Sequence, residues 1–121
     1  MTIIYKEYPK ISIVELNFDG KVTKHDINDV TPRIEAFIAA HGKIKLLEIV
    51  ADHFDGFELS TLIKSIKFDK KHLKDFSHCA VVTNKGWIGP ITRLASSVFD
   101  IEIKVFTIKN KEDALTWLEE V

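Results

Sequence analysis

The sequence predicts a single α/β domain in which four helices cover a mixed, mostly parallel sheet of four to five strands. Short apolar runs typical of buried strands alternate with helix-periodic segments, and this alternation implies right-handed βαβ crossovers. The chain has 121 residues, a usual size for one domain, so we expect residues 1–121 to form one unit. A hydrophobic content of 45% is enough for one core.

The first two predicted strands lie near the amino terminus. Residues 2–5 and 11–18 are β-type runs, and the second alternates apolar and polar side chains over part of its length. Pro9 separates the two runs, and Asp19-Gly20 is a turn signal after the second. We expect the first strand to pair as an antiparallel edge.

A helix is predicted after this turn. Thr23 is a candidate N-cap, and Asp26 three residues later nearly completes a capping box, with Asp in place of Glu or Gln. The apolar side chains that then recur at helical spacing are Ile27, Val30, Ile34, Phe37 and Ile38. The pattern ends at His41-Gly42, and Pro32 inside it predicts a bend.

Strands and helices alternate along the rest of the chain. The predicted strands are residues 44–51, 78–83 and 101–108. The predicted helices are residues 57–74, residues 87–99 and a last helix that Asn110 caps. Residues 44–51 are apolar on both faces, as expected of a central strand in a parallel sheet.

Composition excludes several classes of function. The formal net charge of -1 gives no overall attraction to nucleic acid, and the aromatic residues are not interleaved with Arg, so we expect no nucleic-acid partner. The sequence has neither a secretory signal nor an apolar run of about 18 residues, which predicts a cytoplasmic protein that meets a membrane only peripherally, at its inner face. The single Cys79 rules out an intramolecular disulfide and is expected to pack as a small hydrophobic residue.

An acidic turn follows the predicted strand at residues 44–51. Ligands tend to bind at the carboxyl ends of strands in open α/β sheets, so we single out Asp52, His53, Asp55 and Phe57 as interaction residues. Two carboxylates and an imidazole could serve acid–base chemistry or bind a hard metal ion. The more ordinary interpretation is favoured: such residues cap the next helix.

Motifs for catalysis are absent from the sequence. No P-loop, nucleophile elbow or G-x-G-x-x-G pattern occurs, and the five His residues show no paired spacing of the kind that binds zinc. We therefore predict no catalytic residue, no metal ion and no cofactor.

The second and third predicted helices have apolar faces that could line a pocket. The candidate ligand-binding residues are Leu59, Leu62, Ile63, Ile66, Trp87, Ile91, Leu94 and Val98. The candidate membrane-contact residues on the second helix are Lys64, Lys67, Lys70, Lys71 and Lys74. A basic amphipathic helix can lie on an anionic membrane. The alternative is a surface helix whose apolar stripe packs on the sheet.

Several segments resemble the SpoIIAA-like family of small bacterial proteins. They are residues 42–47, 54–57, 71–76, 80–82 with the following Trp87, and 112–118. The resemblance implies the fold shared by STAS domains and by CRAL-TRIO carriers of hydrophobic molecules, with a nonpolar cavity under the second and third helices. Anti-sigma antagonists of this fold carry a phosphorylatable Ser in the turn after the third strand. Gly56 stands at that position, and Ser60 and Thr61 do not restore the motif.

Three functional hypotheses follow. The leading one is a non-enzymatic carrier or sensor of a nonpolar small molecule or lipid, with transient membrane association through the second and third helices. The second is a STAS-like protein-interaction module without a phosphoserine switch. The third is an interfacially activated enzyme that uses Asp52, His53 or Asp55. The oligomeric state stays open.

Overall fold

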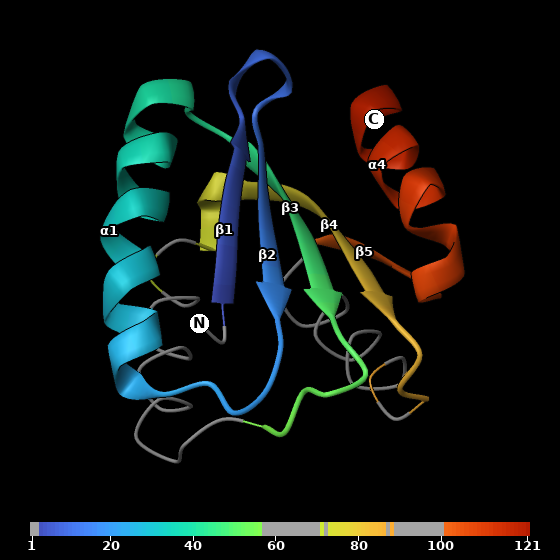
Figure 1. Ribbon diagram of the computed structural model, residues 1–121. Helices are drawn as coiled ribbons and strands as arrows, with labels where there is room; N and C mark the ends of the chain where they lie inside the picture. The colour runs from blue at the N-terminus through green and yellow to red at the C-terminus, as the bar shows by residue number, and fades with distance from the viewer. Residues whose placement is uncertain (1–2, 57–70, 72, 87, 89–100) are drawn as a thin grey trace.

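A computed structural model of the chain describes residues 3–56, 71, 73–86, 88 and 101–121. Its five strands are β1 (Ile3–Tyr8), β2 (Ile13–Phe18), β3 (Ile44–Val50), β4 (Phe76–Thr83) and β5 (Glu102–Phe106). They form one sheet in the order β1-β2-β3-β4-β5, in which β1 is antiparallel to β2 and the other pairs are parallel. The mostly parallel sheet and its antiparallel first edge are thus confirmed (Figure 1).

Two of the four predicted helices, α1 (Lys24–His41) and α4 (Lys111–Glu120), fall within the described residues. The other two, at residues 57–74 and 87–99, lie almost entirely outside them. A short 3-10 helix at Leu73–Asp75 leads directly into β4, where the sequence predicted the end of a helix at residue 74.

Several strand ends differ from the predictions. β1 extends to Tyr8, and a 3-10 turn at Pro9–Ile11 then reverses the chain. Ser12 completes this reversal with a left-handed φ of 54°, so β2 begins only at Ile13. β5 ends at Phe106 because a 3-10 turn at Ile108–Asn110 leads into α4.

Helix α1 begins and ends as its sequence signals predict. The Thr23 hydroxyl accepts a hydrogen bond from the Asp26 N–H at 3.3 Å, and the Asp26 carboxylate accepts one from the Thr23 N–H at 2.8 Å, which completes the capping box. At the other end, the Gly42 N–H donates to the Ile38 carbonyl at 2.8 Å with a φ of 75°. Pro32 lies inside the helix on its exposed side.

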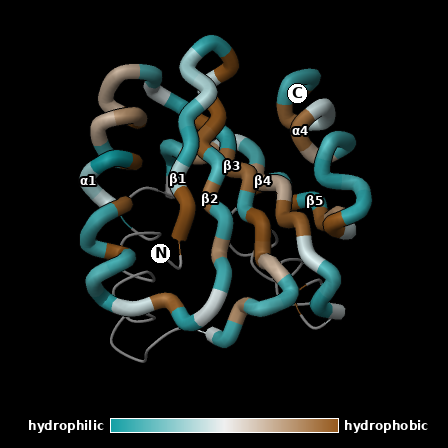
Figure 2. The backbone as a smooth tube through the Cα atoms, viewed as in Figure 1, coloured by the Kyte–Doolittle hydropathy of each residue, from teal (hydrophilic) through white to brown (hydrophobic). Residues whose placement is uncertain are grey.

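The two helices pack on opposite faces of the sheet. On the α1 face, Val14, Leu16, Phe18, Val50, Cys79 and Val81 are buried in one core cluster together with the apolar stripe of the helix. The α4 face buries Ile13, Leu47, Ile49, Ala80 and Val82 against Ala114 and Leu118. Figure 2 shows the apolar colouring concentrated on the strands between the helices. Cys79 is buried as a small hydrophobic residue, as expected.

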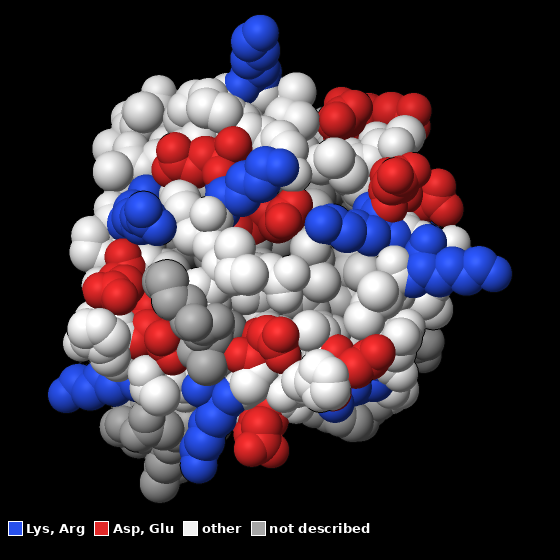
Figure 3. All heavy atoms as spheres, viewed as in Figure 1, with Lys and Arg blue, Asp and Glu red and all other residues white. Residues whose placement is uncertain are grey.

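Polar side chains interact over the β1–β2 half of the α4 face. The Tyr8 hydroxyl donates to the Glu15 carboxylate at 2.8 Å, and Lys111 Nζ lies 3.9 Å from the other Glu15 oxygen. Burial, and then the bond to Glu15, raises the pKa of the Tyr8 phenol, which therefore remains a proton donor. Acidic and basic side chains are interspersed on the side of the molecule that Figure 3 shows.

Lys45 anchors the carboxyl end of α4. Its Nζ donates to the main-chain oxygens of Leu118 and Val121, both at 2.6 Å. The last carbonyls of a helix have no partner within the helix, and a cation there also complements the helix dipole. The side chain of a β3 residue therefore fixes where the last helix docks.

Replacing Lys45 by Met should destabilise the domain. Met retains most of the apolar length of the side chain but removes the charged donor, so we expect the free energy of unfolding to fall by about 1.5 kcal/mol. Urea unfolding of Lys45→Met measures this loss. Lys43→Met, at an exposed position two residues earlier, is the matched control and should change stability little. Equal stability of the two variants would contradict the anchoring role of Lys45.

Candidate functional site

The carboxyl ends of the parallel strands lie at one edge of the sheet. β2, β3, β4 and β5 run in the same direction, so the segments that follow them meet there (Figure 1). We call the segments 19–22, 51–56, 83–86 and 107–108 the carboxyl rim. In open α/β folds this edge is the usual place for binding.

Main-chain hydrogen bonds join the acidic turn to the loop after β2. The donor and acceptor pairs are Ala51 N–H to Phe18 O at 3.0 Å, Gly20 N–H to His53 O at 3.0 Å, Asp55 N–H to Gly20 O at 2.7 Å and Val22 N–H to Gly56 O at 2.9 Å. Gly20 and Gly56 have φ values of 77° and 91°, a region that residues with a Cβ rarely adopt. These hydrogen bonds therefore continue the pairing of β2 with β3 into the acidic turn and hold the turn in place.

Phe54 points inward and anchors the turn. It packs against the α1-side core, and its ring meets that of Phe18 edge-on with 6.4 Å between the centroids. The flanking Asp52, His53 and Asp55 are exposed. The predicted interaction residues other than Phe57 thus lie on one anchored turn with their side chains in solvent. Phe57 lies outside the described residues.

Asn84, which the sequence analysis did not single out, connects three strand ends. Its Oδ1 accepts a hydrogen bond from the Ile108 N–H at 3.1 Å, and its Nδ2 donates to Asp52 Oδ1 at 3.5 Å. Lys85 Nζ reaches the Asp52 carbonyl at 3.4 Å. The available signal was the position of Asn84-Lys85-Gly86 directly after a strand next to β3. Only the strand order shows that this turn adjoins Asp52.

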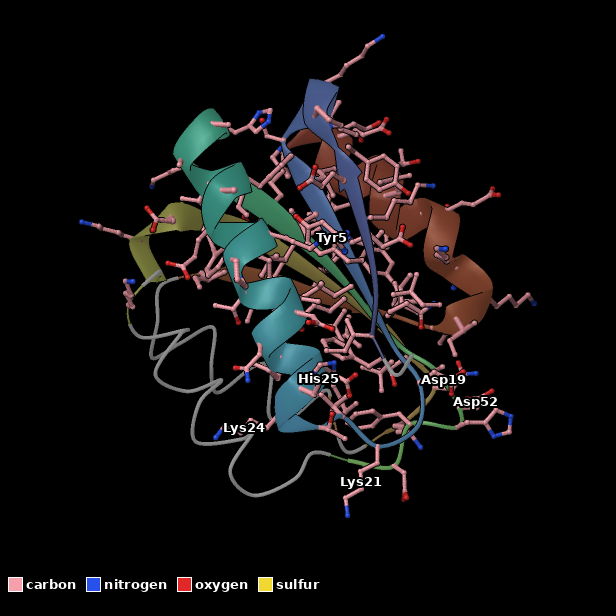
Figure 4. All side chains as sticks on the ribbon, turned by 60° about the vertical axis from the view of Figure 1, so that its left-hand side comes forward. Tyr5, Asp19, Lys21, Lys24, His25 and Asp52 are labelled. Atoms are coloured by element: carbon pink, nitrogen blue, oxygen red, sulfur yellow. The ribbon has the colours of Figure 1, made fainter. Side chains whose placement is uncertain are left out.

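The charges on the rim are mixed. Asp19, Asp52 and Asp55 are exposed, and so is Lys21. Figure 4 shows Asp19, Lys21 and Asp52 together at this end of the molecule. Within the described ranges, no group of three or more His, Cys, Asp or Glu side chains is arranged to hold a metal ion. An exposed polar surface on an ordered loop is better suited to binding a partner than to acid–base chemistry, which benefits from desolvated groups.

The predicted pocket lies outside the described residues, since none of its eight side chains is among them. The same is true of Lys64, Lys67 and Lys70. Of the predicted membrane-contact residues, Lys74 is exposed, and Lys71 forms an ion pair with Glu35 of α1 at 3.3 Å. Both partners are solvent-exposed, so the pair contributes little stability. No helix in the described part of the chain is long and apolar enough to span a membrane.

Glu48 is a second residue that sequence reasoning missed. It lies on central strand β3, half-buried, on the same face as Leu46 and Val50. The sequence offered a signal for this residue, because Glu48 is the one carboxylate in the mostly apolar segment that forms β3. Its register partners are Leu16 on β2 and Val81 on β4, both buried and apolar.

Comparisons with known proteins agree with this architecture. The profile of the SpoIIAA-like family matches residues 13–119. The chain belongs to the SpoIIAA-like family. Among solved structures it is similar to an uncharacterized protein with a SpoIIAA-like fold from Shewanella loihica PV-4, at 27% identity and a TM-score of 0.80, over 96% of this chain and 91% of that one. No curated protein matches.

The anti-sigma factor antagonist SpoIIAA, in its unphosphorylated form, is a more distant structural neighbour. The TM-score is 0.64 at 8% identity, over 98% of this chain and 99% of that one. This likeness shows a shared SpoIIAA-like fold across the whole chain. The family profile begins at the first residue of β2, so strands β2 to β5 fall within the match and β1 precedes it.

Proposed function

We propose that this SpoIIAA-like protein is a non-enzymatic module that binds a protein partner through its carboxyl rim. The observation that carries the proposal is an exposed turn, Asp52 to Asp55, held by main-chain hydrogen bonds and by the inward Phe54. A surface that is already ordered loses little conformational entropy when a partner binds.

The family relationship supports a protein partner. SpoIIAA is named as an anti-sigma factor antagonist, so at least one protein of this fold acts in a system of interacting proteins. Phosphoserine control is not part of the proposal, because Gly56 stands in the turn where the phosphorylatable Ser is expected. Its φ of 91° also favours Gly over any side-chain-bearing residue.

The electrostatics support a partner with charges of both signs. Asp55 and Asp19 are exposed acids, and Lys21 is an exposed base. Figure 4 shows Asp19, Lys21 and Asp52 at the same end of the molecule. Charges of both signs at the periphery of an interface mainly fix the orientation of the partner and exclude other proteins, and they add less to affinity. The third hypothesis, an interfacially activated enzyme that uses these side chains, stays a prediction.

Site-specific photo-crosslinking tests the rim directly. A photoreactive amino acid at His53 should crosslink a partner in cells of the source organism, and the charge reversal Asp55→Lys should reduce that product severalfold because it changes an exposed rim charge. The same probe at Thr116, an exposed residue of α4, is the positional control. Asp29→Lys, on the exposed side of α1, controls for charge alone. Equal crosslinking from both positions, or equal sensitivity to both reversals, would remove the rim from the interface.

A nonpolar ligand is the second candidate function. On their α1 side, strands β3 to β5 carry the apolar Val50, Cys79, Val81 and Ile103, which belong to the core on that face. The two segments that connect these strands are the ones predicted as amphipathic helices with an apolar pocket between them. If that pocket exists, Lys64, Lys67, Lys70, Lys71 and Lys74 would bring it to an anionic membrane.

Native mass spectrometry and vesicle sedimentation test this second candidate. A bound lipid or other nonpolar molecule should appear as a discrete added mass after gentle purification. The protein should also sediment with vesicles containing anionic phosphatidylglycerol and less with neutral phosphatidylcholine, and Lys67→Glu combined with Lys70→Glu should weaken this several-fold. Lys109→Glu, at an exposed position near α4, is the matched control. An unmodified mass together with no sedimentation on either lipid would reject the carrier hypothesis.

A further inference from the structure

The sheet has two outer strands that differ in charge pattern. β1 and β5 end the strand order, and in the part of the chain that the structure describes no strand pairs with the outer side of either. An unpaired edge strand can accept another strand through its main-chain groups. The side chains along each edge decide whether a second copy of the chain fits.

β5 carries opposite charges two residues apart on the α4 face. Glu102 has a side chain that is 68% exposed, and Lys104 is exposed as well. Strand side chains alternate between faces, so both lie on the same side of the sheet as Phe106. Val105, on the α1 side, is 39% exposed; among the described large apolar residues, Ile4 of β1 and Val121 are also exposed.

A two-fold axis restricts how two β5 strands can pair. In an antiparallel pair, opposite residues point to the same face of the sheet. A two-fold axis therefore allows only registers in which one residue lies opposite its own copy. A register centred on Ile103 places Glu102 of each copy opposite Lys104 of the other. It also places Val105 opposite Ile101, which covers the exposed Val105 side chain with an apolar neighbour.

The alternative registers are less favourable. Centring the pair on Glu102 or on Lys104 puts two like charges directly opposite each other, which destabilises a sheet. Centring it on Val105 leaves Glu102 outside the pairing. On β1, a register centred on Lys6 again opposes like charges, and one centred on Tyr5 places Lys6 opposite the apolar Ile4. A register centred on Ile4 pairs only residues 3–5 of β1 and includes no pair of opposite charges.

We propose that two copies of this chain associate through antiparallel pairing of their β5 strands, centred on Ile103. The resulting sheet is continuous across the two-fold axis. Two symmetric Glu102–Lys104 pairs set the register on the α4 face, and Val105 is covered on the α1 face. The pairing uses residues 101–105, whereas the carboxyl rim begins after the end of β5, so this association does not require the partner proposed for the rim.

A charge swap tests the register. Lys104→Glu places a carboxylate opposite Glu102 at both symmetric positions and should weaken the dimer about tenfold or more in sedimentation equilibrium. Glu102→Lys should do the same. The double variant, which carries both substitutions, restores opposite charges across the axis and should recover dimerisation. Lys6→Glu on β1 is the matched control and should leave the dimer unchanged.

The comparison of the single and double charge variants distinguishes a loss of dimerisation from a loss of folding stability. Glu102 also lies 3.1 Å from His78, and the Lys104 ammonium lies 5.3 Å from the Phe106 ring centroid, so thermal unfolding of each variant checks the fold. As a second measurement, Ile103→Cys should form an intermolecular disulfide under mild oxidation, while the buried Cys79 stays reduced. A wild-type protein that is monomeric up to about millimolar concentration, or a double variant no better than the single ones, would overturn the proposal.

Discussion

The parallel pairing of β2, β3 and β4 is the constraint on which the candidate site depends. It places the ends of these strands at one edge, where the acidic turn, the loop after β2 and the turn at Asn84 meet. The main-chain hydrogen bonds between residues 18–22 and 51–56 extend this pairing beyond the strands. The buried apolar residues on both faces keep the register, since a shift by one residue would expose them.

Much of the fold could be predicted because local signals and the global fold agree. Thr23 and Asp26 marked the start of α1, and the double-faced apolar run at residues 44–51 marked the central strand. The strand and helix ends that differ from the predictions have local causes. The left-handed Ser12 delays β2, and Leu73–Asp75 turns as a 3-10 helix into β4; neither has a strong sequence signature.

The candidate site was predicted only in part. Its exposed members, Asp52, His53 and Asp55, follow from their place after a buried strand. The role of Asn84 could not be predicted, because its partners lie 32 and 24 residues away in the sequence and only the strand order brings them together. The anchoring role of Lys45 could not be predicted for the same reason. Its partners are main-chain oxygens at the end of α4, and main-chain oxygens have no sequence pattern. The predicted pocket residues lie outside the described part of the chain and stay a prediction.

The central claim is that the carboxyl rim is an ordered surface before any partner binds. Amide hydrogen exchange of the free protein tests it most directly, through the N–H groups of Gly20, Val22 and Asp55. These amides donate to main-chain oxygens across the rim, so they should be protected to nearly the same degree as amides within β2 and β3. Exchange at the rate of an unstructured peptide would contradict the claim, because the turn would then have to be ordered at the cost of binding energy.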